Sequence, residues 1–551
     1  MILDRWALAV LLAAGCGGGS GGGVDGDGGP ADGQGDGGGG DGPGEGDGGG
    51  APISTPVMPL LDGDAFYPRA IELDDGTILA SVVAPQPSGR LGGTVLASDD
   101  EGVTFDVIGA IDGDHAAGGL CCATLYRLPR ALGPLPAGSI LWSASAGGDD
   151  PGAPMSIPVF ASSDGGASWS FLSNVTVAGV PRSQGGLWEP EFEQLDDGSL
   201  VCHYSDETDG NHSQKLVARR STDGVTWSAA RETVAMAPFG ARPGMPVVRR
   251  APDGRHAMSF EICGTDGCAT HLRFSADGWD WGNAADPALR PAMLGGLHFR
   301  HAPTLAVSDR PGGNGRFYLV GQMLTDPGGA PSAQNGRVLL ASSEGGGGTW
   351  YPIAAPVPVP DAYDNFCPNY SSAILPLDRG RVVLEIASAW EDGHCRTFFA
   401  RGPLGGRRSD ALKDGVGYVL RSLQSAFCLD VVDGSGAPGA NIRQWDCNGS
   451  GAQHFAPEPQ PDGSVRLVNV GSGLCVGAAG DSEQAGANVE QVACDNATRW
   501  RIESVGVDHV RVVHDGTDVC LDVAGGSTEM GGNVQQWTCN DLAPQIWRAE
   551  P

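Results

Sequence analysis

The chain has 551 residues, a net charge of −32 at pH 7, 89 glycines and 14 cysteines. This length is too great for one ordinary core and predicts roughly two to four domains. The strong negative charge argues against binding to nucleic acid or to anionic lipid, because both are polyanions that the chain would repel. We therefore expect a neutral or weakly charged partner.

The N-terminus reads "MILDRWALAVLLAAGC", with one arginine, a short apolar run from Trp6 and small residues before Cys16. The run is too short to cross a membrane and is typical of an export signal. Small residues followed at once by cysteine resemble a bacterial lipobox, although Ala13 stands where that motif prefers leucine. We therefore expect residues 1–16 to be a lipoprotein signal peptide, with lipidation at Cys16. Ordinary signal cleavage nearby is the alternative.

Residues 17–54 are rich in glycine and aspartate and hold almost no apolar side chains, so they cannot form a core. We expect a disordered linker, with a root-mean-square reach of roughly 30 to 35 Å for a glycine-rich chain. The protein is then exported and lipid-anchored at the cell envelope, at the outer membrane or cell surface, or else secreted. The lipid would be its only contact with a membrane.

Five segments of the middle region resemble the Asp box, SxDxGxTW, of sialidase-like propellers. They span residues 98–105, 162–169, 221–227, 275–281 and 342–350. The third and fourth are one residue short, and the fifth has one extra residue and Glu344 in place of aspartate. Each suits a tight turn in which the carboxylate accepts hydrogen bonds from backbone N–H groups and glycine takes a positive φ. Their role is therefore structural.

Six further segments each combine an apolar strand, a turn and a second apolar strand, which indicates a β-hairpin. The first reads "PRAIELDDGTILASVV" and the last reads "SSAILPLDRGRVVLEIAS". Hairpins alternating with Asp-box turns predict four-stranded blades. We therefore expect an all-β protein with a six-bladed β-propeller, the catalytic domain, over residues 55–403.

The C-terminal region contains three repeats, each bounded by two cysteines. The pairs are Cys428 and Cys447, Cys475 and Cys494, and Cys520 and Cys539. In an exported chain, this equal spacing predicts one disulfide per repeat. Three repeats with Q-x-W-like ends resemble the ricin-B-type β-trefoil of carbohydrate-binding module family 13. We therefore expect a carbohydrate-binding β-trefoil over residues 411–551.

Sugar sites of that module combine an aspartate, an aromatic ring and amide side chains, since a carboxylate binds vicinal hydroxyls while the ring stacks on the sugar. The first and third repeats supply this set: Asp430, Trp445, Asn448 and Gln453, then Asp522, Trp537, Asn540 and Gln545. The middle repeat has Gly477 and Val492 at the matching places. We therefore expect two weak sugar sites and one structural repeat.

The segment "GGLWEPEFE" places Glu189, Glu191 and Glu193 on one face of a predicted strand. One interpretation is a solvated edge. In a propeller, however, Glu189 lies just ahead of the first strand of blade three, and Glu261 closes the second strand of blade four. Both therefore emerge on the upper face, whereas Glu191 and Glu193 are expected to be solvated or structural.

A lone carboxylate such as Glu261, in the apolar strand "HAMSFEICG", costs several kcal/mol unless it is paired or protonated. An ion pair with an arginine is the structural alternative. Two carboxylates in different environments at one pocket are what glycoside hydrolysis requires. We therefore predict that Glu189 and Glu261 are catalytic.

The segments "LWEPEFEQLDDGSLVCHYSDE", "RPGMPVVRRAPDGRHAMSFEICG" and "DNFCPNYSSAILPL" resemble glycoside hydrolase family 93, the exo-α-1,5-L-arabinanases. The resemblance covers nearly the whole propeller. It implies a six-bladed sialidase-type fold, release of arabinobiose from the non-reducing end of arabinan, and retention of configuration through two glutamates. The matching positions are Glu189 and Glu261, one as nucleophile and one as acid/base.

Two other functions remain open. An exo-sialidase, or another propeller exo-glycosidase, shares the Asp boxes, but a sialidase needs three arginines and a tyrosine nucleophile. Arg69 is displaced from the usual "RIP"-like motif, while Arg242 and Tyr370 remain available; we take all three as candidate substrate-binding residues. The second alternative is a sugar-binding lipoprotein without catalysis, since fold alone does not prove chemistry.

The remaining cysteines leave their disulfide pairing open, and the histidines do not indicate a metal site. Cys121 and Cys122 form a vicinal disulfide or simply pack, and the pairs Cys263 with Cys268 and Cys367 with Cys395 are possible bridges. The scattered histidines show no metal-ligand spacing, so we expect no catalytic metal and no cofactor. The expected partner is a plant polysaccharide, arabinan or a related glycan, and the expected state is a monomer.

The lipid anchor is tested by replacing Cys16 with serine. We expect Cys16→Ser to release the protein from the membrane fraction, or to leave a precursor of higher mass, because the thiol that carries the lipid is gone. Fractionation followed by mass spectrometry is the measurement. Unchanged membrane partitioning of the variant would show that the sequence only imitates a lipobox.

Overall fold

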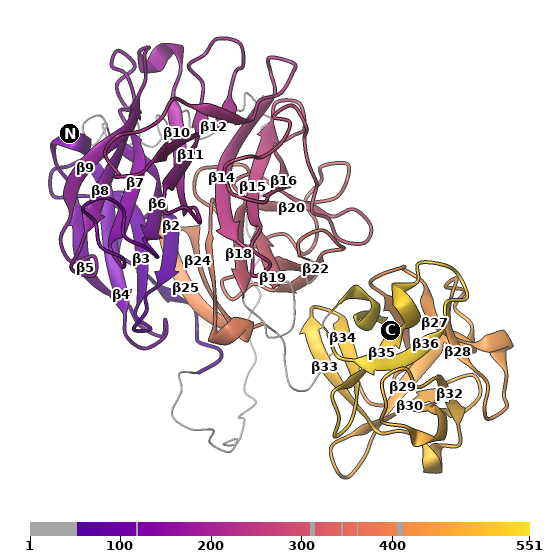
Figure 1. The fold of residues 1–551 in the computed structure, drawn as a ribbon. Coiled ribbons are helices and arrows are strands. Elements are labelled where there is room, and N and C mark those ends of the chain that lie inside the picture. Colours follow the sequence, from indigo (N-terminus) through magenta and orange to yellow (C-terminus); the bar gives the residue numbers. More distant parts are fainter. Residues whose placement is uncertain are drawn as a thin grey trace.

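The structure, a computed structural model, describes residues 52–116, 119–308, 315–342, 345–360, 362–404, 412–540 and 542–551. The predicted signal peptide, Cys16 and most of the predicted linker lie outside the described residues. No helix within these ranges is long and apolar enough to cross a bilayer. The described chain consists of strands joined by short 3-10 helices, which confirms the predicted all-β class. Figure 1 shows a ring of sheets followed by a smaller C-terminal domain.

The larger domain is a six-bladed propeller, as predicted. Blade one holds β2 (Phe66–Glu72), β3 (Ile78–Pro85), β4 (Leu91–Ser98) and β5 (Asp106–Ile111). Blade two holds β6 (Leu120–Arg127), β7 (Ile140–Ala146), β8 (Ser156–Ser162) and β9 (Ser170–Val177). Blade three holds β10 (Leu187–Gln194), β11 (Leu200–Asp206), β12 (Lys215–Ser221) and β13 (Arg231–Val234).

The other three blades complete the ring. Blade four holds β14 (Arg242–Arg250), β15 (His256–Cys263), β16 (Ala269–Ser275), β17 (His298–Arg300) and β20 (Met323–Thr325). Blade five holds β18 (Thr304–Ser308), β19 (Arg316–Val320), β21 (Val338–Ser342) and β22 (Tyr351–Ala354). Blade six holds β23 (Ala373–Leu377), β24 (Val382–Glu391), β25 (His394–Pro403) and, from the N-terminus, β1 (Met58–Pro59). Short 3-10 helices join them: η1 (Asp114–Ala116), η2 (Arg182–Gln184) and η3 (Asp378–Gly380).

The first strands of the six blades contact one another in a closed cycle, β2, β6, β10, β14, β18, β23 and back to β2. Closure depends on the N-terminal segment, because β1 pairs antiparallel with β25 as the outermost strand of blade six. The Leu60 N–H also donates to the Thr397 carbonyl (2.8 Å), and the Ala65 N–H donates to the Cys395 carbonyl (2.8 Å). The two ends of the propeller sequence therefore meet in one sheet.

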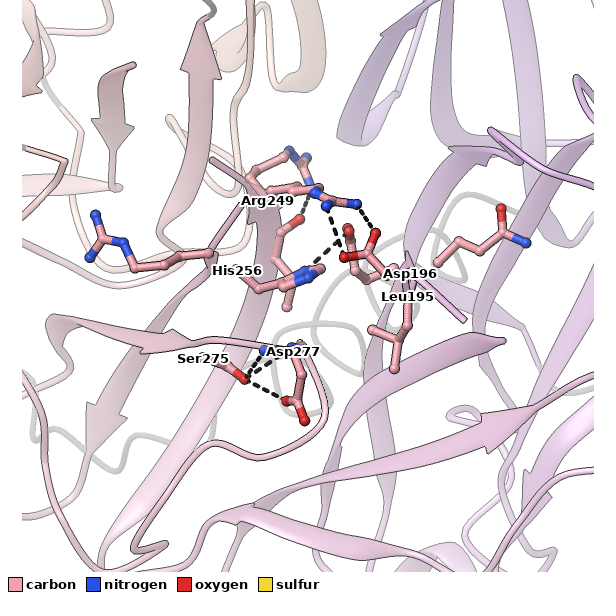
Figure 2. Close-up of polar contacts among 12 residues, drawn as sticks. Leu195, Asp196, Arg249, His256, Ser275 and Asp277 are labelled. Carbon is pink, nitrogen blue, oxygen red and sulfur yellow. Dashed lines mark hydrogen bonds and ion pairs between the residues drawn. The ribbon is translucent and has the colours of Figure 1, made fainter. Parts of the chain in front are cut away.

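The predicted turns between outer strands have the expected hydrogen bonds. In blade four, Ser275 Oγ donates to Asp277 Oδ1 (3.1 Å), and the same oxygen accepts the Trp279 and Asp280 N–H groups (2.9 and 2.8 Å) (Figure 2). Gly278 takes a φ of 72°. The carboxylates of Asp100, Asp164 and Asp223 accept backbone N–H groups in the same way. Glu344, in the fifth predicted turn, lies outside the described residues.

The smaller domain is a β-trefoil of three repeats, as predicted. Its strands are β26 (Tyr418–Ser422), β27 (Cys428–Val431), β28 (Ile442–Trp445), β29 (His454–Pro459), β30 (Val465–Asn469), β31 (Cys475–Ala478), β32 (Val489–Val492), β33 (Trp500–Gly506), β34 (His509–His514), β35 (Val519–Val523), β36 (Val534–Thr538) and β37 (Trp547–Glu550). Its 3-10 helices are η4 (Val432–Gly434), η5 (Gly451–Gln453), η6 (Ala479–Asp481), η7 (Cys494–Asn496), η8 (Ala524–Gly526) and η9 (Ala543–Gln545).

The predicted threefold repeat of the trefoil is visible in its bonds. Each repeat has its expected disulfide: Cys428–Cys447, Cys475–Cys494 and Cys520–Cys539. One asparagine of each repeat also joins a closed hydrogen-bond ring, in which Asn441 donates to Asn533 (2.8 Å), Asn533 to Asn488 (3.0 Å) and Asn488 to Asn441 (2.8 Å). The ring satisfies these amides by linking all three repeats.

The trefoil packs against blade five of the propeller, where β33 lies beside β22 (Figure 1). The Val507 N–H donates to the Pro352 carbonyl (2.8 Å), and the rings of Tyr351 and His509 lie 5.7 Å apart. Apolar side chains of both domains share one buried cluster here. The contact is therefore both apolar and hydrogen-bonded.

Candidate functional site

Every blade has a residue with a positive φ near the start of its first strand, inside the strand in blades one to four and two residues ahead of it in blades five and six. These residues are Tyr67 (53°), Cys122 (60°), Glu189 (59°), Met245 (57°), Ala302 (45°) and Ser371 (55°). In the first four blades, the strand register also slips at this point, which marks a β-bulge. Positive φ is costly for residues other than glycine and is concentrated at functional sites. Several of these residues share a buried cluster, so the bulges meet near the propeller axis.

Glu189 lies at the bulge of β10, inside the strand rather than just ahead of it as predicted. Its side chain is buried, and Oε2 accepts hydrogen bonds from Ser205 Oγ (2.7 Å) and from the Met245 N–H (2.7 Å). Its own N–H donates to Ser145 Oγ (3.1 Å). Residues from blades two, three and four therefore fix this one glutamate.

Glu261 lies near the end of β15 and is 8% exposed. Its Oε2 accepts a hydrogen bond from the Ala302 N–H (2.8 Å), and His301 Nδ1 lies 4.0 Å from the same oxygen. Cys263 Sγ lies 3.4 Å from Oε1. Within the described part of the chain, no arginine forms an ion pair with Glu261, so the predicted structural alternative does not hold there.

The two glutamates face each other across Gly244, which pairs with Glu261 in the β14–β15 register. A Cβ atom on Gly244 would lie 3.5 Å from Glu189 Oε2 and 3.7 Å from Glu261 Oε1. The two oxygens are therefore no more than about 7 Å apart, an upper limit that is compatible with a pair of glycosidase carboxylates. Such a Cβ would also lie 2.5 Å from Gln214 Nε2, so a side chain at this position would displace the Gln214 amide.

The environments of the two carboxyl groups differ. Burial raises the pKa of Glu261 to about 8, and the negative charge of Glu189 adds to this rise. Burial also raises the pKa of Glu189, but the hydrogen bonds from Ser205 and Met245 oppose it by stabilising the ionised form. Glu261 therefore keeps its proton near neutral pH, while Glu189 has the donors that a carboxylate needs.

An apolar pocket lies beside the carboxylates and is lined by Phe66, Tyr67, Val83, Leu91, Leu120, Cys121, Cys122, Phe366 and Tyr370. The hydroxyls of Tyr67 and Tyr370 lie 3.7 and 3.8 Å from Met245 Sδ, next to the N–H that binds Glu189. Burial raises the pKa of both phenols, so they stay protonated. Aromatic walls beside polar groups suit the apolar face of a sugar.

The propeller cysteines form the bridges that the sequence left open. Cys121 and Cys122 form a vicinal disulfide in the pocket wall. The Cys263–Cys268 disulfide lies beside Glu261, and the Cys367–Cys395 disulfide joins the loop before β23 to β25. Two of the three bridges therefore border the candidate site.

The predicted substrate-binding residues have different surroundings. Tyr370 lines the pocket. Arg242 is partly exposed and donates to Glu207 Oε1 (2.5 Å) and Gln214 Oε1 (2.7 Å), at the rim of the carboxylate pair. Arg69 is buried beneath the Tyr67 ring, 4.3 Å from its centroid, and donates to the Ser371 carbonyl (3.1 Å). Arg69 therefore positions Tyr67.

The solvated-edge interpretation of Glu191 and Glu193 is wrong, because their side chains are 2% and 6% exposed. Glu191 accepts hydrogen bonds from Thr124 Oγ1 (2.8 Å) and from Arg249. Glu193 Oε1 lies 3.3 Å from His256 Nδ1. Figure 2 shows His256 close to Asp196, at the end of the strand away from Glu189. The inner strands are packed on both faces, so these carboxylates are structural.

The predicted sugar-binding residues of the trefoil form two similar groups. In the first repeat, Gln453 donates to Asp430 Oδ2 (3.1 Å) and its Oε1 accepts the Asn448 N–H (2.8 Å). In the third repeat, Gln545 donates to Asp522 Oδ2 (3.2 Å) and its Oε1 accepts the Asn540 N–H (2.9 Å). The aromatic partners are Trp445 and Trp537.

The middle repeat of the trefoil lacks this group. Gly477 stands where the other repeats have aspartate, and Thr498 Oγ1 accepts the Ala478 N–H (2.8 Å) beside it. A Cβ on Gly477 would lie 2.7 Å from the Val492 side chain, so this place is filled by apolar contact. Within the trefoil, only the first and third repeats therefore present a carboxylate beside a tryptophan.

Among the described residues, two groups of side chains have the composition of metal ligands, but neither suits a metal. Glu261 and His301 lie with Cys263 and Cys268, whose sulfurs are joined in a disulfide and so offer no thiolate. Asp209, His212 and Glu232 form the other group. There the Lys215 ammonium lies between Asp209 and Glu232, at 2.5 and 3.0 Å, where a cation would sit.

Several residues of the site were not predicted from the sequence, namely Tyr67, Gln214, Met245, His301 and Ala302. A signal for some of them was present, because proline follows the positive-φ residue in four blades: Pro68, Pro190, Pro246 and Pro303. An alignment of the hairpins on this proline puts Met245 and Ala302 at the position equivalent to Glu189. No comparable sequence signal identifies His301 or Gln214.

The comparisons with known proteins agree with both domains. Residues 417–547 match the model of the ricin-type beta-trefoil lectin domain. No curated protein sequence matches this chain.

The solved structures that resemble the propeller include two enzymes with a bound sugar. One is the Penicillium chrysogenum alpha-L-arabinanase complexed with arabinobiose, at 23% identity and a TM-score of 0.55, covering 64% of this chain and 99% of that chain. The other is the GH93 alpha-L-arabinofuranosidase of Fusarium graminearum with arabinobiose, at 23% identity and a TM-score of 0.54, again covering 64% and 99%. At this identity, the likeness shows a shared propeller fold.

The raised pKa of Glu261 predicts a measurable pH dependence of stability. The carboxyl ionises at about 8 in the folded protein but near its ordinary value of 4.5 when unfolded. The folded state therefore binds one more proton between these values, and stability falls as pH rises from about 5 to about 8. We expect the difference in melting temperature, Glu261→Gln minus wild type, to increase as pH rises from about 5 to about 8. Above this window the difference should stay constant. A constant difference from pH 5 to 9 would contradict the assignment.

Proposed function

We propose that the chain is an exported, retaining exo-glycosidase that hydrolyses α-1,5-L-arabinan from its non-reducing end and releases arabinobiose. The observation that carries this proposal is the pair of buried carboxyl groups, Glu189 and Glu261, facing each other across Gly244 in unlike environments. The shared fold with two enzymes whose structures hold arabinobiose supports the choice of substrate.

The geometry favours one assignment of the acid/base and nucleophile roles to the two glutamates. Glu261, with its pKa raised to about 8, donates a proton to the leaving glycosidic oxygen. Glu189 attacks the anomeric carbon as a carboxylate, and the glycosidic bond breaks as the ester forms. Glu261 then takes a proton from water, the resulting hydroxide displaces Glu189, and the sugar leaves with its configuration retained.

The surrounding residues have supporting roles in this scheme. Ser205 Oγ and the Met245 N–H hold the attacking carboxylate in place before and after ester formation. The pocket of Tyr67, Tyr370 and the Cys121–Cys122 disulfide receives the apolar faces of the sugar. Arg242, at the rim, is placed to donate to sugar hydroxyls beside its bonds to Glu207 and Gln214.

The surroundings of the arginines favour this function over a sialidase. A sialidase needs three arginines around the carboxylate of its substrate, whereas Arg69 is buried and bonded to Ser371. Burial also disfavours ionisation of Tyr370, which weakens it as a nucleophile. A neutral arabinan further suits a chain with a net charge of −32.

We also propose that the trefoil directs the enzyme to its polysaccharide, as its match to a lectin domain suggests. Export is consistent with the six disulfides among the described residues, since such bonds persist in oxidising compartments. Lipid anchoring through Cys16 remains part of this proposal.

The proposed reaction is tested by incubating the purified protein with linear arabinan and, separately, with sialyl-lactose. We expect arabinobiose to be the single early product from arabinan, because an exo enzyme releases one unit size from the chain end. Chromatography of the first minutes of reaction is the measurement. Release of sialic acid without arabinobiose, or a ladder of arabinan fragments, would refute the assignment.

The two candidate catalytic residues are tested by isosteric substitution. We expect Glu189→Gln and Glu261→Gln each to lower kcat by at least about 100-fold, since loss of positioned acid/base catalysis costs 100-fold to 10,000-fold. Glu193→Gln is the matched control, a buried glutamate on the same strand that should retain activity. Either catalytic variant turning over arabinan at near wild-type rate, with normal melting, would remove that residue from the mechanism.

A further inference from the structure

The two candidate sugar groups of the trefoil differ at one position. Arg443 in the first repeat and Gln535 in the third stand at the same distance along the chain from their aspartates, Asp430 and Asp522. Both side chains donate to the Oδ1 atom of that aspartate, at 3.0 Å in each case. One repeat therefore holds its carboxylate with a cation and the other with a neutral amide.

In the first repeat, Arg443 lies over the aromatic ring on which a sugar would stack. Its guanidinium carbon lies 3.8 Å from the centroid of the Trp445 ring, while its Nε donates to Asp430. A second carboxylate, Asp433, lies 3.5 Å from Nη2. A sugar would have to displace the guanidinium from the ring and compete with it for Asp430, and both exchanges oppose binding.

The third repeat has no such cover. The Trp537 side chain is 45% exposed, and within the described part of the chain no arginine or lysine lies over its ring. Among the described residues no cation pairs with Asp522, and its two oxygens each accept one amide hydrogen bond, from Gln535 and from Gln545. Each oxygen therefore keeps a second lone pair that can accept a hydrogen bond from a sugar hydroxyl. This repeat presents both elements of a sugar site, a ring face and an acceptor.

We propose that the trefoil has one open site for a neutral sugar, formed by Asp522 and Trp537, and that Arg443 closes the equivalent site of the first repeat. This inference rests on the sugar-binding role proposed for the domain. An acidic sugar is disfavoured in the first repeat, because Asp430 and Asp433 together outweigh the single charge of Arg443. Arg443 is then a residue that sets the number of working sites.

The experiment exchanges the two residues in the full-length chain. Isothermal titration with lactose, a neutral sugar with vicinal hydroxyls, should give one site per chain for wild type. Arg443→Gln should raise the stoichiometry to two, because it gives the first repeat the chemistry of the third. Gln535→Arg should weaken binding by about tenfold or more, since ring stacking and a carboxylate hydrogen bond are both lost.

Asparagine variants of the two aspartates locate the sites. Asp522→Asn should abolish binding in the wild-type background, and Asp430→Asn should leave it unchanged. Two equal sites in wild type, or an unchanged stoichiometry in a normally melting Arg443→Gln, would overturn the inference while leaving the lectin role intact. Binding of galacturonic acid that depends on Arg443 would also overturn it. Failure of the wild-type chain to bind lactose would refute both the inference and the lectin role.

Discussion

Two carboxyl groups lie close together and removed from water in this propeller, and the cost of burying them is the constraint around which the site is organised. Each is held by a backbone N–H at the start of the next blade, Glu189 by Met245 and Glu261 by Ala302. A backbone donor brings no charge of its own, so it stabilises the buried oxygen without neutralising the carboxyl group. Gly244 leaves the space between them free of a side chain. Altering any one of these contacts changes the ionisation of both glutamates.

The positive φ near the start of each first strand frees the backbone N–H groups that bind the two glutamates. A regular strand would use the Met245 N–H in its own ladder, whereas the bulge of β14 releases it toward a neighbouring blade. Ala302 lies just ahead of β18, so its N–H is also outside a ladder. The same local geometry recurs in all six blades, but only two of the six N–H groups bind the candidate catalytic glutamates. The strain is therefore a property of the fold, and the choice of side chains near it sets the chemistry.

The repeats made most of the architecture predictable. Hairpin and turn patterns gave six blades, and equal cysteine spacing gave the trefoil disulfides, because both depend on local geometry. Glu189 and Glu261 were predictable because strand order alone places them on one face. The burial of Glu191 and Glu193 was not, since alternation along a strand cannot show that both faces are packed. Arg443 was also missed, because aligning the repeats on their shared residues draws attention away from the position where they differ.

The short strand β1 has a mechanical consequence. It completes blade six from the N-terminal end of the propeller, and its ladder with β25 joins Met58 and Pro59. Thr55, Leu60 and Ala65 each add one backbone hydrogen bond to the same strand. Any pulling force applied through the N-terminus reaches the domain first at this edge of blade six, before it reaches a blade core. A load large enough to break these bonds would strip the outermost strand from blade six, which lies opposite blade three and two blades away from blade four. The β1–β25 pairing therefore sets the tension that the folded propeller withstands when it is held by its N-terminus.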